Sequence, residues 1–120
     1  MREFRYFDVE LRGPVTELHL ADTKFLDTER YAELLDELLA FVEQERPRRL
    51  LINLSRVTYC STAVMSALIA VQNRLSSHSA AGVMKLCGAS EVVGEALRRL
   101  KLDQGVFDIH STDVAAIQAF

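Results

Sequence analysis

A short apolar run at residues 50–54 lies between two segments with the pattern of amphipathic helices, and this arrangement constrains the fold strongly. The run is too short for a typical helix and contains one polar side chain, Asn53. Such a run is typical of a strand that is buried on both faces, as in sheets with helices packed on each side. The sequence therefore predicts an α/β protein with residues 50–54 as a central strand.

The first twenty residues have the pattern of a strand pair. Residues 4–11 and 15–20 are each rich in apolar residues, and Gly13-Pro14 between them is a turn signal. Two short strands joined in this way indicate an antiparallel pair. The apolar face expected for the first strand consists of Phe7, Val9 and Leu11.

Three longer segments have the periodicity of amphipathic helices. The first begins near Asp27, whose side chain can cap a helix, and stops near Arg46 because Pro47 follows. The second follows the central strand and carries apolar residues at helical spacing over residues 64–75. The third is expected to be capped by Ser90.

The C-terminal part continues the alternation. Strands are expected at residues 83–87 and 106–109, and Ser111 is expected to cap a last helix with Val114 and Ile117 facing inward. The predicted order is β-β-α-β-α-β-α-β-α. It indicates a four- to five-stranded mixed sheet, mostly parallel, with helices packed against it.

Length and charge narrow the classes of protein. A chain of 120 residues is expected to form one domain over residues 1–120. The net charge is −3, and basic residues are not clustered with aromatic ones, so we expect no nucleic-acid partner. No apolar run approaches the roughly 20 residues that span a bilayer, and the N-terminus lacks the apolar segment of a signal peptide. We therefore expect a cytoplasmic protein with no membrane partner.

No pattern predicts catalysis, a metal or a cofactor. Cys60 and Cys87 form no Cys-x-x-Cys motif, and we expect inert thiols in a reducing compartment. His19, His78 and His110 show no spacing of metal ligands. A glycine-rich phosphate loop is also missing. The chain is therefore expected to have no enzymatic activity.

The turn after the central strand leads into a helix through Cys60-Ser61-Thr62-Ala63. The first N–H groups of a helix have no partner within the helix, and the helix dipole is positive there. A hydroxyl at this position can carry a phosphate, although either Ser61 or Thr62 could equally be a simple cap.

Several segments, taken in order, resemble the STAS domain family, whose best-known members are bacterial anti-sigma factor antagonists. The resemblance covers nearly the whole chain. The matching segments are the strand Leu51-Ile52-Asn53-Leu54-Ser55-Arg56-Val57, the loop Cys60-Ser61-Thr62-Ala63, the strand and turn Leu86-Cys87-Gly88-Ala89-Ser90, and the closing segment Val106-Phe107-Asp108-Ile109.

The resemblance implies a non-enzymatic module that binds a protein partner, a kinase-type anti-sigma factor, in a bacterial partner-switching pathway. It implies phosphorylation at Thr62, with Ser61 as a second candidate. Cys60 and Ala63 stand where the family has Asp and Gly, and Asn53 stands where the strand usually has Asp. The residues expected to bind the partner are Asn53, Cys60, Ser61, Thr62, Ala63, Met65 and Ser66.

Two other interpretations stay open, as does the choice between a monomer and a homodimer. The chain could be a STAS subunit of a transporter or of a stress-signalling complex, without phosphorylation. It could also be a receiver-like phosphocarrier, but Asn53 and the Gly13-Pro14 hairpin argue against that class.

Overall fold

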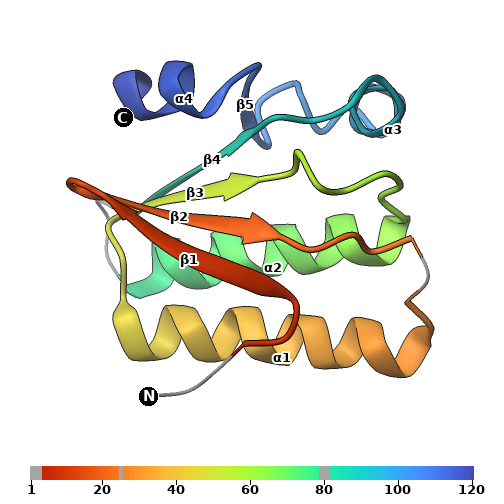
Figure 1. Cartoon of the computed structure of the whole chain (residues 1–120), viewed down its shortest axis with the longest axis horizontal. Helices are drawn as coiled ribbons and strands as arrows, with labels where there is room; N and C mark the ends of the chain where they lie inside the picture. Colours follow the sequence, from red (N-terminus) through yellow and green to blue (C-terminus); the bar gives the residue numbers. More distant parts are fainter. Residues whose placement is uncertain (1–3, 25, 79–81) are drawn as a thin grey trace.

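The fold is built on a five-stranded mixed sheet (Figure 1). The computed structural model describes residues 4–24, 26–78 and 82–120. The strands lie in the order β1-β2-β3-β4-β5, with β1 and β2 antiparallel and every other neighbouring pair parallel. The predicted mixed sheet, with residues 50–54 at its centre, is therefore confirmed. The strands are β1 (Phe7–Arg12), β2 (Val15–Leu20), β3 (Arg49–Asn53), β4 (Val83–Cys87) and β5 (Asp108–His110).

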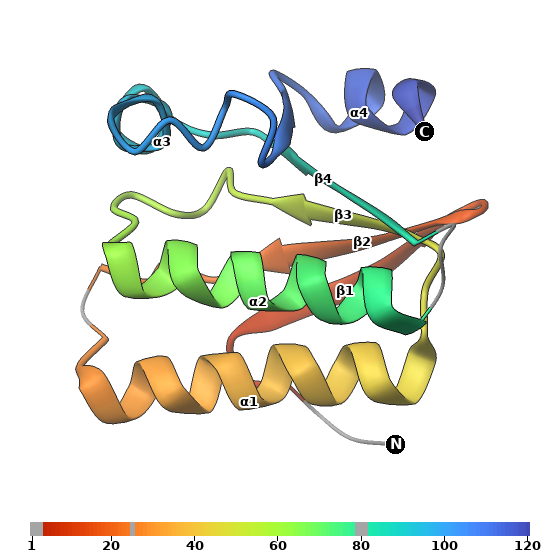
Figure 2. The ribbon, with the colours of Figure 1, turned by 180° about the vertical axis from the view of Figure 1, so that it is seen from behind.

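Two long helices cover one face of the sheet and a short one covers part of the other (Figures 1 and 2). The helices are α1 (Thr28–Glu45), α2 (Thr62–His78), α3 (Glu91–Arg99) and α4 (Asp113–Ala119). α1 and α2 lie side by side, whereas α3 lies next to the loop between β3 and α2 (Figure 1). None of the helices in the described ranges is long and apolar enough to cross a membrane.

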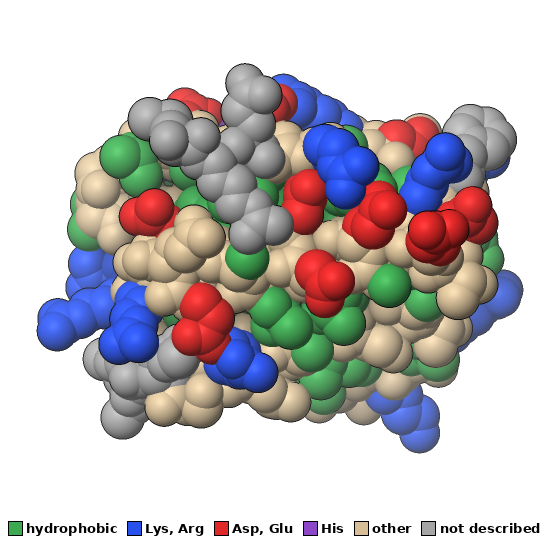
Figure 3. Space-filling view, turned by 90° about the horizontal axis from the view of Figure 1, so that it is seen from below, with side chains coloured by type: hydrophobic (Ala, Val, Ile, Leu, Met, Phe, Trp, Pro, Cys, Tyr) green, Lys and Arg blue, Asp and Glu red, His purple; other side chains and the backbone are tan. Residues whose placement is uncertain are grey.

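The predicted start and stop signals of the helices operate as expected at α1 and α3. The Asp27 side chain accepts a hydrogen bond from the Arg30 N–H at 2.9 Å, and Ser90 caps α3 through the Val93 N–H. Arg46 ends α1 in the left-handed conformation, immediately before Pro47. The solvent side of the α1 and α2 layer carries acidic and basic side chains among apolar ones, as expected for amphipathic helices (Figure 3).

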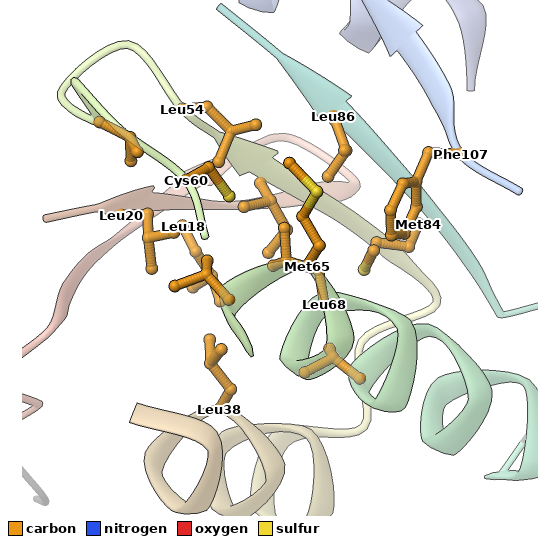
Figure 4. Packing of buried hydrophobic residues seen from close by; sticks show 14 of the residues in the cluster. Leu18, Leu20, Leu38, Leu54, Cys60, Met65, Leu68, Met84, Leu86 and Phe107 are labelled. Carbon is orange, nitrogen blue, oxygen red and sulfur yellow. The ribbon is translucent and has the colours of Figure 1, made fainter. Parts of the chain in front are cut away.

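The larger hydrophobic core lies between the sheet and the α1–α2 layer. Strand residues such as Leu18, Ile52 and Leu86 pack there against Leu38 and Leu68 of the helices, all without exposed surface (Figure 4). A smaller cluster lies on the opposite face of the sheet and is covered by α4. It consists of Val15, Leu51, Cys87 and Ala116, with Ile117 and Phe120 packed against them.

The last helix corrects one prediction. Its cap is Thr112, whose hydroxyl accepts from the Ala115 N–H at 3.1 Å, and not Ser111. Val114 is 53% exposed and does not face inward. Ala116 takes the buried position because the helix presents a different side to the sheet.

Two strands also differ from the prediction. Residues 100–106 form turns and the Phe107 N–H donates to the Leu102 carbonyl, so β5 begins only at Asp108. The first strand begins at Phe7, and of its expected apolar face only Phe7 is buried. Val9 and Leu11 are exposed because β1 is an edge strand and α1 covers only its beginning.

Candidate functional site

The loop between β3 and α2 is held in place by the loop that follows β2. The Thr58 hydroxyl and N–H donate to the Asp22 carboxylate at 2.8 and 3.1 Å. The Thr23 hydroxyl donates to the Tyr59 carbonyl at 2.8 Å. The hydrogen bonds from Thr58 hold the pKa of Asp22 below its usual value. The loop that precedes α2 is therefore fixed at two successive residues.

This loop delivers two hydroxyl residues to the start of α2. The Ser61 hydroxyl accepts a hydrogen bond from the Val64 N–H at 3.3 Å, which is the contact of a capping serine. Thr62 is the first residue of α2, and its side chain is exposed. Ala63 is also exposed and helical, so its methyl group fits the backbone without strain. The N-terminus of α2 thus places a hydroxyl that solvent can reach beside the first N–H groups of the helix, which have no partner within the helix itself.

The neighbouring sulfur-containing residues point into the core instead (Figure 4). Cys60 is 4% exposed and Met65 is 2% exposed, and both belong to the main hydrophobic cluster. Burial raises the pKa of the Cys60 thiol to about 11. Burial, with Glu17 nearby, raises the pKa of Cys87 to about 12. Both thiols are therefore protonated at neutral pH and have little nucleophilic character.

Asn53, at the end of β3, is a buried structural residue. Its amide Nδ2 donates to the Glu17 carboxylate at 2.8 Å, and its Oδ1 accepts from the Ser55 N–H at 2.9 Å. Gly88 lies against it with a φ of +72°, and a Cβ atom there would lie 3.1 Å from Asn53 Oδ1. These contacts hold in place the start of the loop between β3 and α2.

A groove of about 610 Å³ runs between this loop, the start of α2 and helix α3. Exposed apolar side chains line it, with Tyr59 at 50%, Val92 at 58% and Leu100 at 47% exposure. Charged residues of α3 complete its wall. The lining residues are Tyr59, Cys60, Thr62, Met65, Glu91, Val92, Glu95, Ala96, Arg98, Arg99 and Leu100.

The charges on α3 are paired with one another along the helix. Arg98 lies 2.6 Å and Arg99 lies 3.6 Å from carboxylate oxygens of Glu95. The hydrogen bond from Arg98 lowers the pKa of Glu95, so this carboxylate stays ionised. The rim of the groove therefore carries fixed charges of both signs beside an apolar floor.

The structure brings together some of the residues predicted for the site and separates others. Ser61, Thr62, Ala63 and Ser66 reach the surface within the first turns of α2. Asn53, Cys60 and Met65 are almost fully buried, although Cys60 and Met65 also line the groove. The residues predicted to bind the partner did not include the α3 wall. Its signals in the sequence are Val92 and the run Arg98-Arg99-Leu100 at the end of the helix.

Comparison with known proteins places this chain in a family. The STAS domain profile matches residues 6–116, and the chain therefore belongs to the STAS domain family. Curated protein sequences contain no match to it.

Several solved structures share the fold. An anti-sigma factor antagonist from Mycobacterium paratuberculosis superposes with a TM-score of 0.79 at 19% identity, covering 94% of this chain and 91% of that one. An anti-sigma factor antagonist (STAS) domain protein from Planctomyces limnophilus has a TM-score of 0.79 at 23% identity, covering 94% and 96%.

Two further neighbours differ in the function that their names carry. The phosphorylated form of SpoIIAA, a Bacillus cell fate determinant, has a TM-score of 0.65 at 15% identity, covering 94% of this chain and 97% of that one. A sulfate transporter family protein from Wolinella succinogenes has a TM-score of 0.68 at 19% identity, covering 92% and 88%. At these identities the likeness shows the fold alone.

Proposed function

We propose that this STAS domain is a cytoplasmic, non-enzymatic module that binds a kinase-type anti-sigma factor in a bacterial partner-switching pathway. The proposal extends over the whole chain as one domain and places the partner on the groove between the start of α2 and α3. The observation that carries it is the position of Thr62, an exposed hydroxyl at a helix N-terminus on the wall of an apolar groove.

The composition of the groove suits a protein partner. Exposed aromatic and aliphatic side chains surrounded by a charged rim are typical of the central part of a protein interface. Tyr59, Val92 and Leu100 provide the apolar part, and Glu91 and Arg99 lie on the rim. Among the described lining residues we find no pair of a nucleophile and a base, and the Cys60 thiol is buried and protonated. A binding role therefore fits the groove better than catalysis does.

We further propose that phosphorylation at the start of α2 controls the binding. A phosphate on Thr62 would meet the positive end of the helix dipole, so the fold tolerates the added charge. At the interface the same charge would have to be desolvated without a partner, which weakens binding. Ser61 is the second acceptor, because its capping oxygen already lies beside the first-turn N–H of Val64.

The test begins with the partner itself. A pull-down from the source cell should capture a protein with an ATP-binding kinase domain, and the purified pair with ATP should give a phosphorylated form of this chain. Peptide mass spectrometry then assigns the phosphate to Thr62 or Ser61. A phosphate on any other residue, or no phosphorylation at all, would contradict the phosphorylation proposal.

Calorimetry measures the effect of charge on affinity. Thr62→Glu should weaken binding by about 2 kcal/mol, roughly thirtyfold, and Thr62→Ala should leave it largely unchanged. Ser76→Glu, at the exposed far end of α2, is the matched control for added charge and should bind as the wild type does. Circular dichroism confirms that each variant is folded. Equal affinities for Thr62→Glu and the wild type would show a constitutive binder.

That constitutive outcome defines the second candidate function, a STAS subunit of a transporter or stress-signalling complex. It is supported by the neighbour from the sulfate transporter family and by Cys60 and Ala63, which replace two residues of the family motif. A partner from a transport operon, bound equally by both Thr62 variants, would favour it.

A further inference from the structure

A cluster of potential metal ligands lies on the hairpin formed by β1 and β2. Glu10 is directly opposite Glu17 in the antiparallel register, and His19 follows two residues later on the same face of β2. The ligand atoms of these three side chains lie within 4.8 Å of one another. We call Glu10, Glu17 and His19 the acid–histidine cluster. It faces the side of the sheet opposite α1 and α2, and none of its members lines the groove beside Thr62.

The distances in the cluster are close to those of a coordination sphere. His19 Nε2 is hydrogen-bonded to Glu10 Oε1 at 2.8 Å and lies 3.6 Å from Glu17 Oε2. Two ligands bonded to Zn²⁺ at about 2.1 Å in tetrahedral geometry are roughly 3.4 Å apart. The observed pair of distances brackets this value. An ion between the three atoms would replace the hydrogen bond between His19 and Glu10.

Surrounding hydrogen bonds aim the carboxylate oxygens at this point. Arg12 Nη1 lies 3.0 Å from Glu17 Oε1 and 3.8 Å from Glu10 Oε2, so it faces the oxygen of each carboxylate that is turned away from His19. The Asn53 amide donates to Glu17 Oε2 at 2.8 Å. Outer contacts of this kind orient ligands in metal sites. They also leave one oxygen of each glutamate directed toward the imidazole.

The charge of the region is also suited to a cation. Glu17 has no exposed surface, and Glu10 and Asp113 add two more carboxylates around Arg12. Three carboxylates and one guanidinium together carry two negative charges, which one divalent ion would balance. The Glu10 side chain is 49% exposed, so an ion can enter from solvent.

We propose that Glu10, Glu17 and His19 bind one divalent transition-metal ion, with Zn²⁺ as the probe. One imidazole nitrogen and two carboxylate oxygens match the ligand types that zinc accepts, and water would complete the coordination. The site would tie β1 to β2 at the edge of the sheet. It is independent of the function proposed for the groove.

The experiment uses the full chain without an affinity tag, because tag histidines bind zinc. After treatment with a chelator, calorimetric titration with ZnCl₂ should show one saturable site per chain. Thermal unfolding should shift upward by about 5 °C or more at saturating zinc. Cobalt should give the visible absorption bands of a bound Co²⁺ ion.

Matched variants test which side chains bind the zinc ion. His19→Gln and Glu10→Gln should each weaken zinc binding at least about tenfold and abolish the thermal shift. His110→Gln on β5 and Glu29→Gln on α1 should change neither, because they lie outside the cluster. Glu17 is left intact because its burial makes a folding defect the expected result. A wild-type chain that binds no zinc, or equal affinity in all four variants, overturns the proposal.

Discussion

The two faces of the sheet use alternate residues of the same strands for different purposes. Toward α1 and α2, the strands present residues such as Leu18, Ile52 and Leu86, which pack in a wholly apolar core. Toward α4, β2 and β3 present Glu17 and Asn53, which are buried and hydrogen-bonded to each other. The first face is stabilised by the burial of apolar surface, whereas the second combines a smaller apolar cluster with matched charges and matched hydrogen-bond donors. The comparison predicts that substitutions on the two faces will destabilise the fold for different reasons.

The largest expected effect is on the apolar face. Leu68→Ala should lower the free energy of unfolding by about 3 kcal/mol or more, because Leu68 is fully buried between α2 and the sheet and the chain cannot close the cavity. Urea denaturation measures the change. Val114→Ala, on the exposed side of α4, is the control and should cost about 0.5 kcal/mol or less. Equal losses in the two variants would contradict the assignment of the core.

On the polar face, Asn53→Asp keeps the size of the side chain but replaces its amide donor with a carboxylate. The new charge would face the buried Glu17 carboxylate, so we expect a loss of about 2 kcal/mol at pH 7. The loss should shrink in acid, since protonating one carboxyl restores a donor. The same substitution at the exposed Asn73 of α2 is the control. A loss that does not change with pH would contradict the charge argument.

A smaller effect is expected where β4 ends. Gly88→Ala forces a side chain into the left-handed backbone region and places its Cβ 3.1 Å from Asn53 Oδ1, which should cost about 1–2 kcal/mol. Gly105 also has a positive φ of +88°, but its Cβ would meet nothing within 4 Å. Gly105→Ala therefore measures the backbone strain alone. If the two variants unfold at the same urea concentration, contact with Asn53 adds nothing.

The smallest effect concerns an ion pair at the β5 edge of the polar face. The hydrogen bond from Lys85 holds the pKa of Asp108 below its usual value, so this pair stabilises the fold at neutral pH. The contribution should fade as pH drops through the usual aspartate range near 4 and below. Because Asp108 is half exposed, Asp108→Asn should cost only about 0.5 kcal/mol at pH 7.

Urea denaturation at pH 7 and pH 3 tests whether the contribution of this ion pair to stability decreases in acid. The difference in unfolding free energy between the wild type and Asp108→Asn should narrow at pH 3. A difference that widens in acid would mean that the aspartate is not stabilised in its charged form.

Local patterns in the sequence were sufficient for most of the fold. The caps at Asp27 and Ser90 and the buried strand at residues 50–54 depend on neighbours within a few positions. The pairing of Glu17 with Asn53 could not be predicted, because it depends on the parallel register between β2 and β3. For the same reason the acid–histidine cluster is not visible as a spacing in the sequence, since Glu10 and Glu17 come opposite each other only in the hairpin register.

The candidate site also has parts that could be predicted from the sequence and parts that could not. The place of Thr62 at the start of α2 followed from a strand, a turn and a helix that are adjacent in the chain. The α3 wall could not be predicted in this way. Val92 and Leu100 have the periodicity of ordinary helix residues and become part of a groove only through packing. Residues such as Cys60 and Met65 look equally available in the sequence, and their burial is decided by the core.

The double attachment of the β3–α2 loop has a consequence for how fast a partner can bind. With Thr58 held by Asp22 and the Tyr59 carbonyl held by Thr23, the surface proposed to bind the partner is already held in place in the free protein. Association then needs no slow rearrangement on this side, and little flexibility is lost on docking. The rate constant should therefore be set by diffusion and by the charges on the groove rim. The dissociation rate should instead depend mainly on the apolar contacts.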